Sequence, residues 1–298
     1  MATIGPPQTL LSPQLLAQLE RLELVSRKIF RGRLKGERRS KRKGQSVEFA
    51  DFRNYVPGDD IRFIDWNLYA RLDRLFLKLF LEEEDLHFYA LVDVSRSMEF
   101  GEPSKLQFAR QLAGALGFIG LCRADRVKVE ALGATRHNPG PVLRGRKGLW
   151  RLVEYLNNVE PGQNVPLAAA VKEFCLRNTG QGILVLITDL MDKEGYEAAL
   201  RMLLAQRFDT YVVHVLSPEE LDPDLKGDLK LVDCEDGDIA EITVSRPLLD
   251  RYRRTLASFV EGAREFCTRR GMTYLMTKSD TPVETIVANY LRSRGLVR

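Results

Sequence analysis

Two different patterns of hydrophobic and polar positions divide the chain at about residue 86. Beyond that point, short apolar runs alternate with longer segments in which apolar residues recur every three or four positions. The short runs predict buried strands, and the longer segments predict amphipathic helices. We expect strands at residues 86–93, 126–132, 182–189, 210–216 and 273–277, and helices at residues 103–121, 147–158, 166–177, 193–206, 247–270 and 282–293.

The alternation of strands and helices predicts the fold class. A strand that is followed by a helix and then by another strand forms a crossover, which gives parallel pairing with helices on both faces of the sheet. We therefore expect an α/β fold with a mostly parallel, doubly wound sheet in residues 86–298. Residues 140–145 predict a short edge hairpin, and residues 228–244 predict two short strands about an Asp236-Gly237 turn.

Residues 1–85 do not follow this alternation and are expected to form an appended N-terminal region. Leucines at helical spacing predict an amphipathic helix over residues 13–30, and an apolar run predicts a strand over residues 75–81. The expected organisation is therefore one region at residues 1–85 and one α/β domain at residues 86–298.

Composition narrows the class of protein. The chain has 298 residues, of which 44% are hydrophobic and 29% charged, as in ordinary folded globular proteins. No stretch approaches the ~18 apolar residues of a membrane span, and the N-terminus lacks the basic and apolar segments of a signal peptide. The cysteines are far apart and the histidines are isolated, so we expect no zinc site and a reducing, cytoplasmic location.

Positive charge is concentrated in one segment. Residues 26–44 carry ten Lys or Arg and one Glu, whereas the whole chain has a net charge of +4, so the remainder carries −5. A basic segment at residues 27–43 would attract phosphate backbones by counterion release, or an acidic protein partner. Its one aromatic residue, Phe30, gives it no base-stacking platform, so nucleic acid is not the expected partner.

Two of the predicted strands end in an aspartate, Asp93 and Asp189. Ligands of a doubly wound sheet bind at the carboxyl ends of its strands, so both carboxylates are expected at one crevice. Ser95 and Ser97 follow the first strand at alternate positions, which completes an oxygen-only cluster suited to a hard cation such as Mg²⁺. The alternative interpretation is a helix N-cap, for which Asp and Ser are also favoured.

The stretch DVSRSM at residues 93–98 resembles the Asp-x-Ser-x-Ser motif of von Willebrand factor type A domains. The metal-ion-dependent adhesion site of that family, the MIDAS, binds Mg²⁺, with Mn²⁺ or Ca²⁺ as the other candidates. The resemblance implies that Asp93, Ser95, Ser97 and Asp189 are metal ligands. It also implies that an open position on the metal accepts a carboxylate from a partner protein.

One position departs from this family pattern. The family supplies a threonine from an intervening loop, and the matching position here is Val165, whose side chain has no oxygen. The neighbouring family aspartate falls on Pro166, and Asn164 is the candidate substitute for the missing oxygen.

A second resemblance lies in residues 48–85, which are similar to the signature of the bacterial domain-of-unknown-function family 58, DUF58. The resemblance implies a MoxR-type AAA+ ATPase as a partner in chaperone-like assembly. Asp60, Arg62 and Asp65 are expected to form a charged network with Arg53 or Arg71, with Trp66 packed beneath. The matching residues are Arg53, Tyr55, Gly58, Asp59, Asp60, Arg62, Ile64, Asp65 and Trp66.

The expected function is that of a non-enzymatic protein-interaction module. Two alternatives remain: a metal-independent scaffold that binds through residues 27–43, and a hydrolase with Asp93 as nucleophile. The hydrolase would carry a second aspartate two residues later as proton donor, and that position here is Ser95. The chain also has no Gly-rich P-loop and no GxSxG motif.

Overall fold

The computed structural model describes seven stretches of the chain, and their contacts form two compact units. One unit consists of Met1–Arg33 together with Leu86–Arg298, and the other consists of Leu34–Asp85. The described residues are 10–25, 48–81, 86–134, 139–162, 165–178, 181–234 and 237–298.

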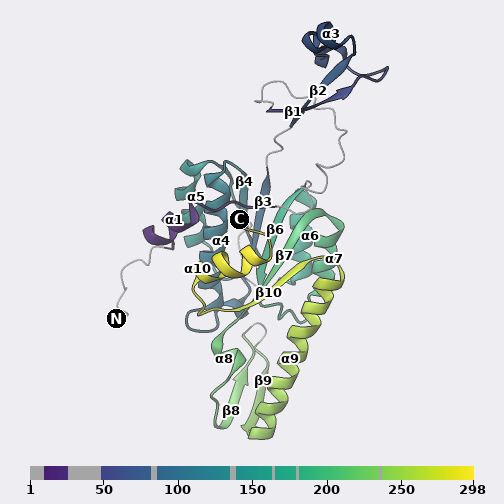
Figure 1. Ribbon diagram of the computed structural model, residues 1–298. Helices are drawn as coiled ribbons and strands as arrows, with labels where there is room; N and C mark the ends of the chain where they lie inside the picture. Colours follow the sequence, from purple (N-terminus) through teal and green to yellow (C-terminus); the bar gives the residue numbers. More distant parts are fainter. Residues whose placement is uncertain are drawn as a thin grey trace. The chain divides into compact units, whose positions relative to one another are not determined.

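The larger unit is built on a six-stranded sheet of order β10-β7-β6-β3-β4-β5 (Figure 1). All neighbours pair in parallel except β5, which runs antiparallel to β4 at the edge. This arrangement confirms the α/β class predicted from the sequence. The strands are β3 (His87–Asp93), β4 (Arg126–Leu132), β5 (Val142–Arg144), β6 (Gln181–Thr188), β7 (Arg207–Leu216) and β10 (Thr273–Lys278).

Helices cover both faces of this sheet. Successive strand residues point to opposite faces, and apolar residues of β3 are buried on each of them. Phe88 and Ala90 belong to the core beneath α4, α5 and α10, whereas Tyr89 and Leu91 belong to the core beneath α6, α7 and α9. The sheet is therefore doubly wound. The helices are α4 (Lys105–Cys122), α5 (Leu149–Asn157), α6 (Leu167–Arg177), α7 (Glu197–Ala205), α9 (Arg246–Arg269) and α10 (Val283–Thr285), which continues as a π-helical turn over Ile286–Leu291.

The N-terminal helix α1 (Pro13–Leu19) is part of the α/β unit. Ser12 caps it, and Leu15 and Leu19 are buried in the core that contains α4. The helix is shorter than predicted because Leu24 instead forms a β-bridge with Val297 near the other end of the chain. The sequence pattern assigns residues 1–85 to one region, whereas these contacts join α1 to the α/β unit.

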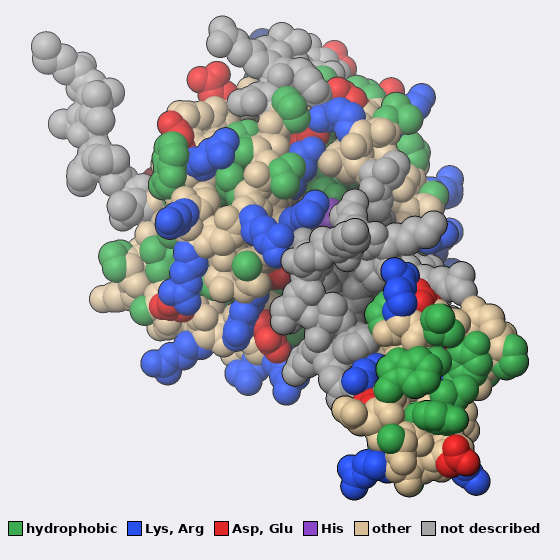
Figure 2. Space-filling view, turned by 90° about the horizontal axis from the view of Figure 1, so that it is seen from above, with side chains coloured by type: hydrophobic (Ala, Val, Ile, Leu, Met, Phe, Trp, Pro, Cys, Tyr) green, Lys and Arg blue, Asp and Glu red, His purple; other side chains and the backbone are tan. Residues whose placement is uncertain are grey.

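The smaller unit pairs β1 (Glu48–Asn54) with β2 (Phe76–Leu81) and adds the short helix α3 (Trp66–Leu72). Asp60 and Arg62 form an ion pair, as predicted, but the partners expected for Arg53 and Asp65 were wrong. The guanidinium of Arg53 lies 2.7 Å from an Asp59 carboxylate oxygen, and Lys78 Nζ lies 3.0 Å from Asp65 Oδ2. The prediction for Trp66 was wrong, since its side chain is exposed. Figure 2 shows hydrophobic side chains gathered on this unit, and Trp66 is one of its exposed apolar residues.

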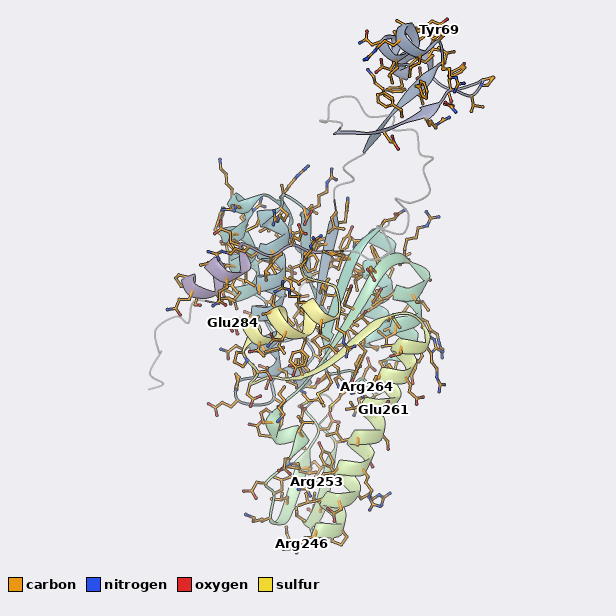
Figure 3. The ribbon with its side chains drawn as sticks, viewed as in Figure 1. Tyr69, Arg246, Arg253, Glu261, Arg264 and Glu284 are labelled. Carbon is orange, nitrogen blue, oxygen red and sulfur yellow. The ribbon has the colours of Figure 1, made fainter. Side chains whose placement is uncertain are left out.

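An arm extends from the larger unit between β7 and β10. It contains α8 (Pro218–Leu221), the predicted two-stranded hairpin of β8 (Gly227–Val232) and β9 (Ile239–Val244), and the first half of α9. Buried residues of α9 are confined to its second half, and Figure 3 shows Arg246 and Arg253 on the projecting half. Asp236 of the predicted turn lies outside the described residues. None of the described helices has the length and apolar character needed to cross a bilayer.

Candidate functional site

The two predicted aspartates lie at the same edge of the sheet. Asp93 is the last residue of β3, and Asp189 directly follows the neighbouring strand β6. The two strands are in register, with Val92 opposite Ile187, so their carboxyl ends coincide. The expectation that both carboxylates share one crevice therefore agrees with the geometry.

The two serines are held close to Asp93 by a short 3-10 turn, η2 (Arg96–Glu99). The backbone N–H of Ser95 donates to Asp93 Oδ1 at 2.9 Å, and the Ser95 and Ser97 hydroxyl oxygens are 3.0 Å apart. Ser95 caps η2 by position, but its side chain makes no capping hydrogen bond there. The hydroxyls are thus directed to one another rather than to the helix end, which weakens the N-cap interpretation.

A small cavity lies between these side chains. Its volume is about 20 Å³, which is room for one water molecule or one ion. Asp93, Ser95, Thr188 and Asp189 line its polar side, and Val165 contributes an apolar wall. Val165 therefore lies where the resemblance places the missing threonine oxygen, and Asn164 lies outside the described residues.

Asp93 is buried close to a second carboxylate, that of Asp189, and both conditions disfavour its charged form. Burial, together with the charge of Asp189, raises its pKa to about 6, although hydrogen bonds from Thr188 and Ser95 oppose this shift. The Thr188 hydroxyl donates to Asp93 Oδ2 at 2.6 Å and fixes the orientation of the carboxylate. A cation in the cavity would relieve the repulsion between the two carboxylates.

Lys105 supplies a positive charge that the sequence pattern did not identify. Its ammonium is fully buried, lies 2.8 Å from Asp189 Oδ2 and also donates to Glu220 Oε1. Burial would lower the pKa of this ammonium, but the charges of Asp189 and Glu220 outweigh burial and raise the pKa. Lys105 therefore stays protonated and joins α4, the end of β6 and α8.

Asp192 is a second residue that the sequence pattern missed. It lines the same cavity, and its carboxylate accepts hydrogen bonds from the backbone N–H groups of Leu167 and Glu194. Leu167 is the first residue of α6, so Asp192 joins the loop after β6 to the loop that contains Val165. The sequence could have indicated Thr188 and Asp192, because both lie within three residues of Asp189 in the LITDLMD stretch. Lys105 lies 84 positions away from Asp189, and no nearby motif points to it.

The donor set fits a hard divalent cation better than zinc. The carboxylates of Asp93, Asp189 and Asp192 and the hydroxyls of Ser95 and Thr188 line the cavity, and oxygen donors of this kind suit Mg²⁺. One oxygen of Asp189 already accepts from Lys105, and Val165 offers none. Within the described stretches, no three His, Cys, Asp or Glu side chains lie close enough together to hold a metal.

Curated relatives of this chain occur in mycobacteria. The uncharacterized protein Rv1480 of Mycobacterium tuberculosis (strain H37Rv) is 27% identical over 267 residues, covering 86% of this chain and 84% of the relative. The uncharacterized protein Mb1516 of Mycobacterium bovis matches with the same identity and coverage.

Solved structures are similar at lower identity. An aerotolerance-related membrane protein from Bacteroides fragilis is 16% identical, with a TM-score of 0.43, and the match covers 71% of this chain and 98% of that one. The conserved hypothetical protein BatB from Bacteroides thetaiotaomicron is 14% identical, with a TM-score of 0.42, over 70% and 98% of the two chains. The manganese-loaded TRAP protein of Plasmodium vivax is 15% identical, with a TM-score of 0.35, over 68% and 72%.

A family model covers most of the two units described above. The model is described as "Protein of unknown function DUF58" and matches residues 51–261, which include the ion pairs of the smaller unit and the Asp93 and Asp189 edge of the sheet. The resemblance seen in the GDDIRFIDW stretch is therefore confirmed, and this chain belongs to the DUF58 family.

Proposed function

We propose that this protein is a non-enzymatic interaction module that binds a partner protein through a divalent cation, with Mg²⁺ as the first candidate. Asp93, Ser95, Ser97 and Asp189 would hold the ion, and a carboxylate of the partner would take an open position on it. The observation that carries the proposal is the convergence of Asp93, Ser95 and Asp189 at an ion-sized cavity, with the Ser97 hydroxyl oxygen 3.0 Å from that of Ser95. The bound ion would supply positive charge at a point where the protein itself has an excess of carboxylates.

The charges around the cavity support a bridging role for the ion. Asp93, Asp189, Asp192 and Glu220 carry four negative charges and Lys105 carries one positive charge, so a divalent cation reduces the excess of negative charge in the cluster. Hydroxyl oxygens add no further charge, so the ion keeps its attraction for an incoming carboxylate. The exposed Arg96 stands between the two serines in the sequence and offers a guanidinium for the same carboxylate.

We propose no catalytic role for Asp93. The residue two positions later is Ser95, which cannot serve as the proton donor of an Asp-based hydrolase. His214, whose pKa burial lowers to about 4, has its Nδ1 2.6 Å from the Tyr274 hydroxyl. The family resemblance supports a MoxR-type AAA+ ATPase in the partner system, and the widely spaced cysteines support a cytoplasmic location.

Calorimetric titration of Mg²⁺ and Mn²⁺ into the protein tests the proposal. We expect saturable binding by the wild type, loss of that binding in Asp93→Ala, and unchanged binding in Asp224→Ala, which removes an exposed carboxylate. Binding to a purified MoxR-type ATPase should then require Mg²⁺ and decrease in Ser95→Ala. Absence of saturable metal binding by the folded wild type, with and without the ATPase, contradicts the metal-dependent part of the proposal.

A further inference from the structure

The β8–β9 hairpin presents an exposed face that is both apolar and acidic. Its register places Val232 opposite Ile239 and Lys230 opposite Glu241, and Asp228 lies two residues before Lys230, so all five side chains share one face. All five are exposed, and Val232 and Ile239 retain 61% and 58% of their surface. Leu229, Ile242 and Val244 lie on the opposite face, and each of them is partly buried.

This hairpin needs an additional contact surface. An isolated two-stranded sheet is marginally stable in water, and exposed apolar pairs on it favour coverage by another surface. Residues 227–244 contain six acidic residues and one basic residue. The surface that covers this face is therefore expected to be apolar and positively charged.

The chain itself carries a surface of that kind on β5 and α5. Trp150 of α5 and Val142 of the edge strand β5 are 65% and 66% exposed, and residues 142–154 contain four basic residues and one acidic residue, Glu154. Lys147 and Arg151 are exposed on either side of Trp150. A shallow groove on this surface, here called the α5 groove, is lined by Arg146, Lys147, Leu149, Trp150, Val153, Glu154, Asn157 and Asn158.

The hairpin and the α5 groove lie at opposite ends of the α/β unit (Figure 1), so they cannot meet within one chain. We propose that the outward face of the hairpin docks in the α5 groove of a second copy of this protein. Val232 and Ile239 would pack against Trp150, and the acidic hairpin residues would lie against Lys147 and Arg151. Tryptophan in a groove is a typical anchor of a protein interface, and opposite charges on the two surfaces fix their orientation.

The two docking surfaces differ, so the contact is head to tail. Each copy that has bound one neighbour still presents its other surface, and the assembly grows as an open chain or closes as a ring, depending on the rotation between neighbours. Neither surface includes the Asp93 cavity. This inference is therefore independent of the metal-dependent function proposed above.

Sedimentation velocity over a range of protein concentrations tests the head-to-tail contact. We expect the wild type to exceed the monomer mass of 33.9 kDa with increasing concentration, and to do so less at high salt. Trp150→Asp and Val232→Asp should each weaken self-association roughly tenfold or more, because each places a carboxylate against the acidic or apolar side of the contact. Leu176→Asp, at a side chain that is 75% exposed on α6, is the matched control and should associate as the wild type does.

Mixing the two variants gives the decisive result. A Trp150→Asp copy retains an intact hairpin and a Val232→Asp copy retains an intact α5 groove, so an equimolar mixture should form particles of two copies and stop there. A wild type that stays monomeric at low salt and the highest attainable concentration overturns the inference. Association that persists in both variants, or a mixture that gives no two-copy particle, also overturns it. Binding of single-stranded DNA in the α5 groove without self-association would assign that surface to nucleic acid instead.

Discussion

Replacement of the buried ammonium of Lys105 should destabilise the protein more than any surface change. Lys105→Met keeps an unbranched apolar stem in α4 and removes the charge that pairs with Asp189 and Glu220. The side chains of Asp189 and Glu220 are only 2% and 12% exposed, so water cannot replace the lost partner. Both carboxylates would remain in the interior without their cation.

The magnitude follows from the cost of an uncompensated buried charge. Removing one partner of a buried ion pair typically costs about 3–5 kcal/mol, which is a large part of the roughly 5–15 kcal/mol of a typical domain. The Ser217 N–H still donates to Glu220 and the Met191 N–H still donates to Asp189, so we expect the cost within this range rather than above it. Adding Asp189→Asn to Lys105→Met should restore part of the loss, because the second change removes one of the two unpaired charges.

Urea unfolding at neutral pH, followed by far-ultraviolet circular dichroism, measures this loss. Lys226→Met is the control, because the pair of Lys226 with Asp224 is 84% exposed on both sides and such pairs contribute about 0–1 kcal/mol. The reasoning is refuted if Lys105→Met unfolds within about 1 kcal/mol of the control, since the ammonium would then not be the counterion of the cluster.

Four further substitutions test other parts of the α/β unit. The pKa of His214 is lowered to about 4, so between pH 6.5 and pH 4 the folded state binds fewer protons than the unfolded state. The free energy of unfolding should therefore fall by roughly 2 kcal/mol between pH 7 and pH 5. Urea unfolding at these two pH values should show a smaller fall in His214→Gln. Thr188→Val removes the hydroxyl that donates to Asp93 and should cost about 1–3 kcal/mol in the same assay; an unchanged midpoint would contradict the assigned hydrogen bond. Gly182→Ala would place a Cβ atom 2.2 Å from the carbonyl oxygen of His87 and should lower the melting temperature. Gly262→Ala has space in α9 and should raise the melting temperature. The reverse order would refute the packing of β6 against β3.

Much of the sheet could be predicted from hydrophobic periodicity. The strand at β6 reads as a continuous apolar run, and β4 reads as an alternation of apolar and charged residues, with predicted bounds of 126–132 that match the structure. The two apolar runs that end in Asp93 and Asp189 also predicted that these residues would lie together, because parallel neighbours end at one edge. Local pattern was sufficient for the parallel pairing, because strands that alternate with helices pair in parallel, whereas the order of the strands in the sheet does not follow from it.

Other features depend on contacts between residues that are distant in sequence. Lys105 lies 84 positions before Asp189 and 115 before Glu220, so its apolar helix gave no sign of a buried ion pair. The end of α1 is set by the bridge from Leu24 to Val297, which also has no local signal. Trp66 is large and apolar and was expected inside, but the smaller unit buries few apolar side chains, with Ile64 and Leu77 among them.

The unequal burial of α9 makes the arm a lever. The helix is 24 residues long, and its buried contacts begin at Val260, about 21 Å along the axis from Arg246. A tilt of about 10° at that anchor would carry the tip of the helix through almost 4 Å, by the length of the lever alone. Because a single rigid helix joins the core under β10 to the base of the hairpin, small changes of packing in the α/β unit are magnified where the arm meets its neighbour.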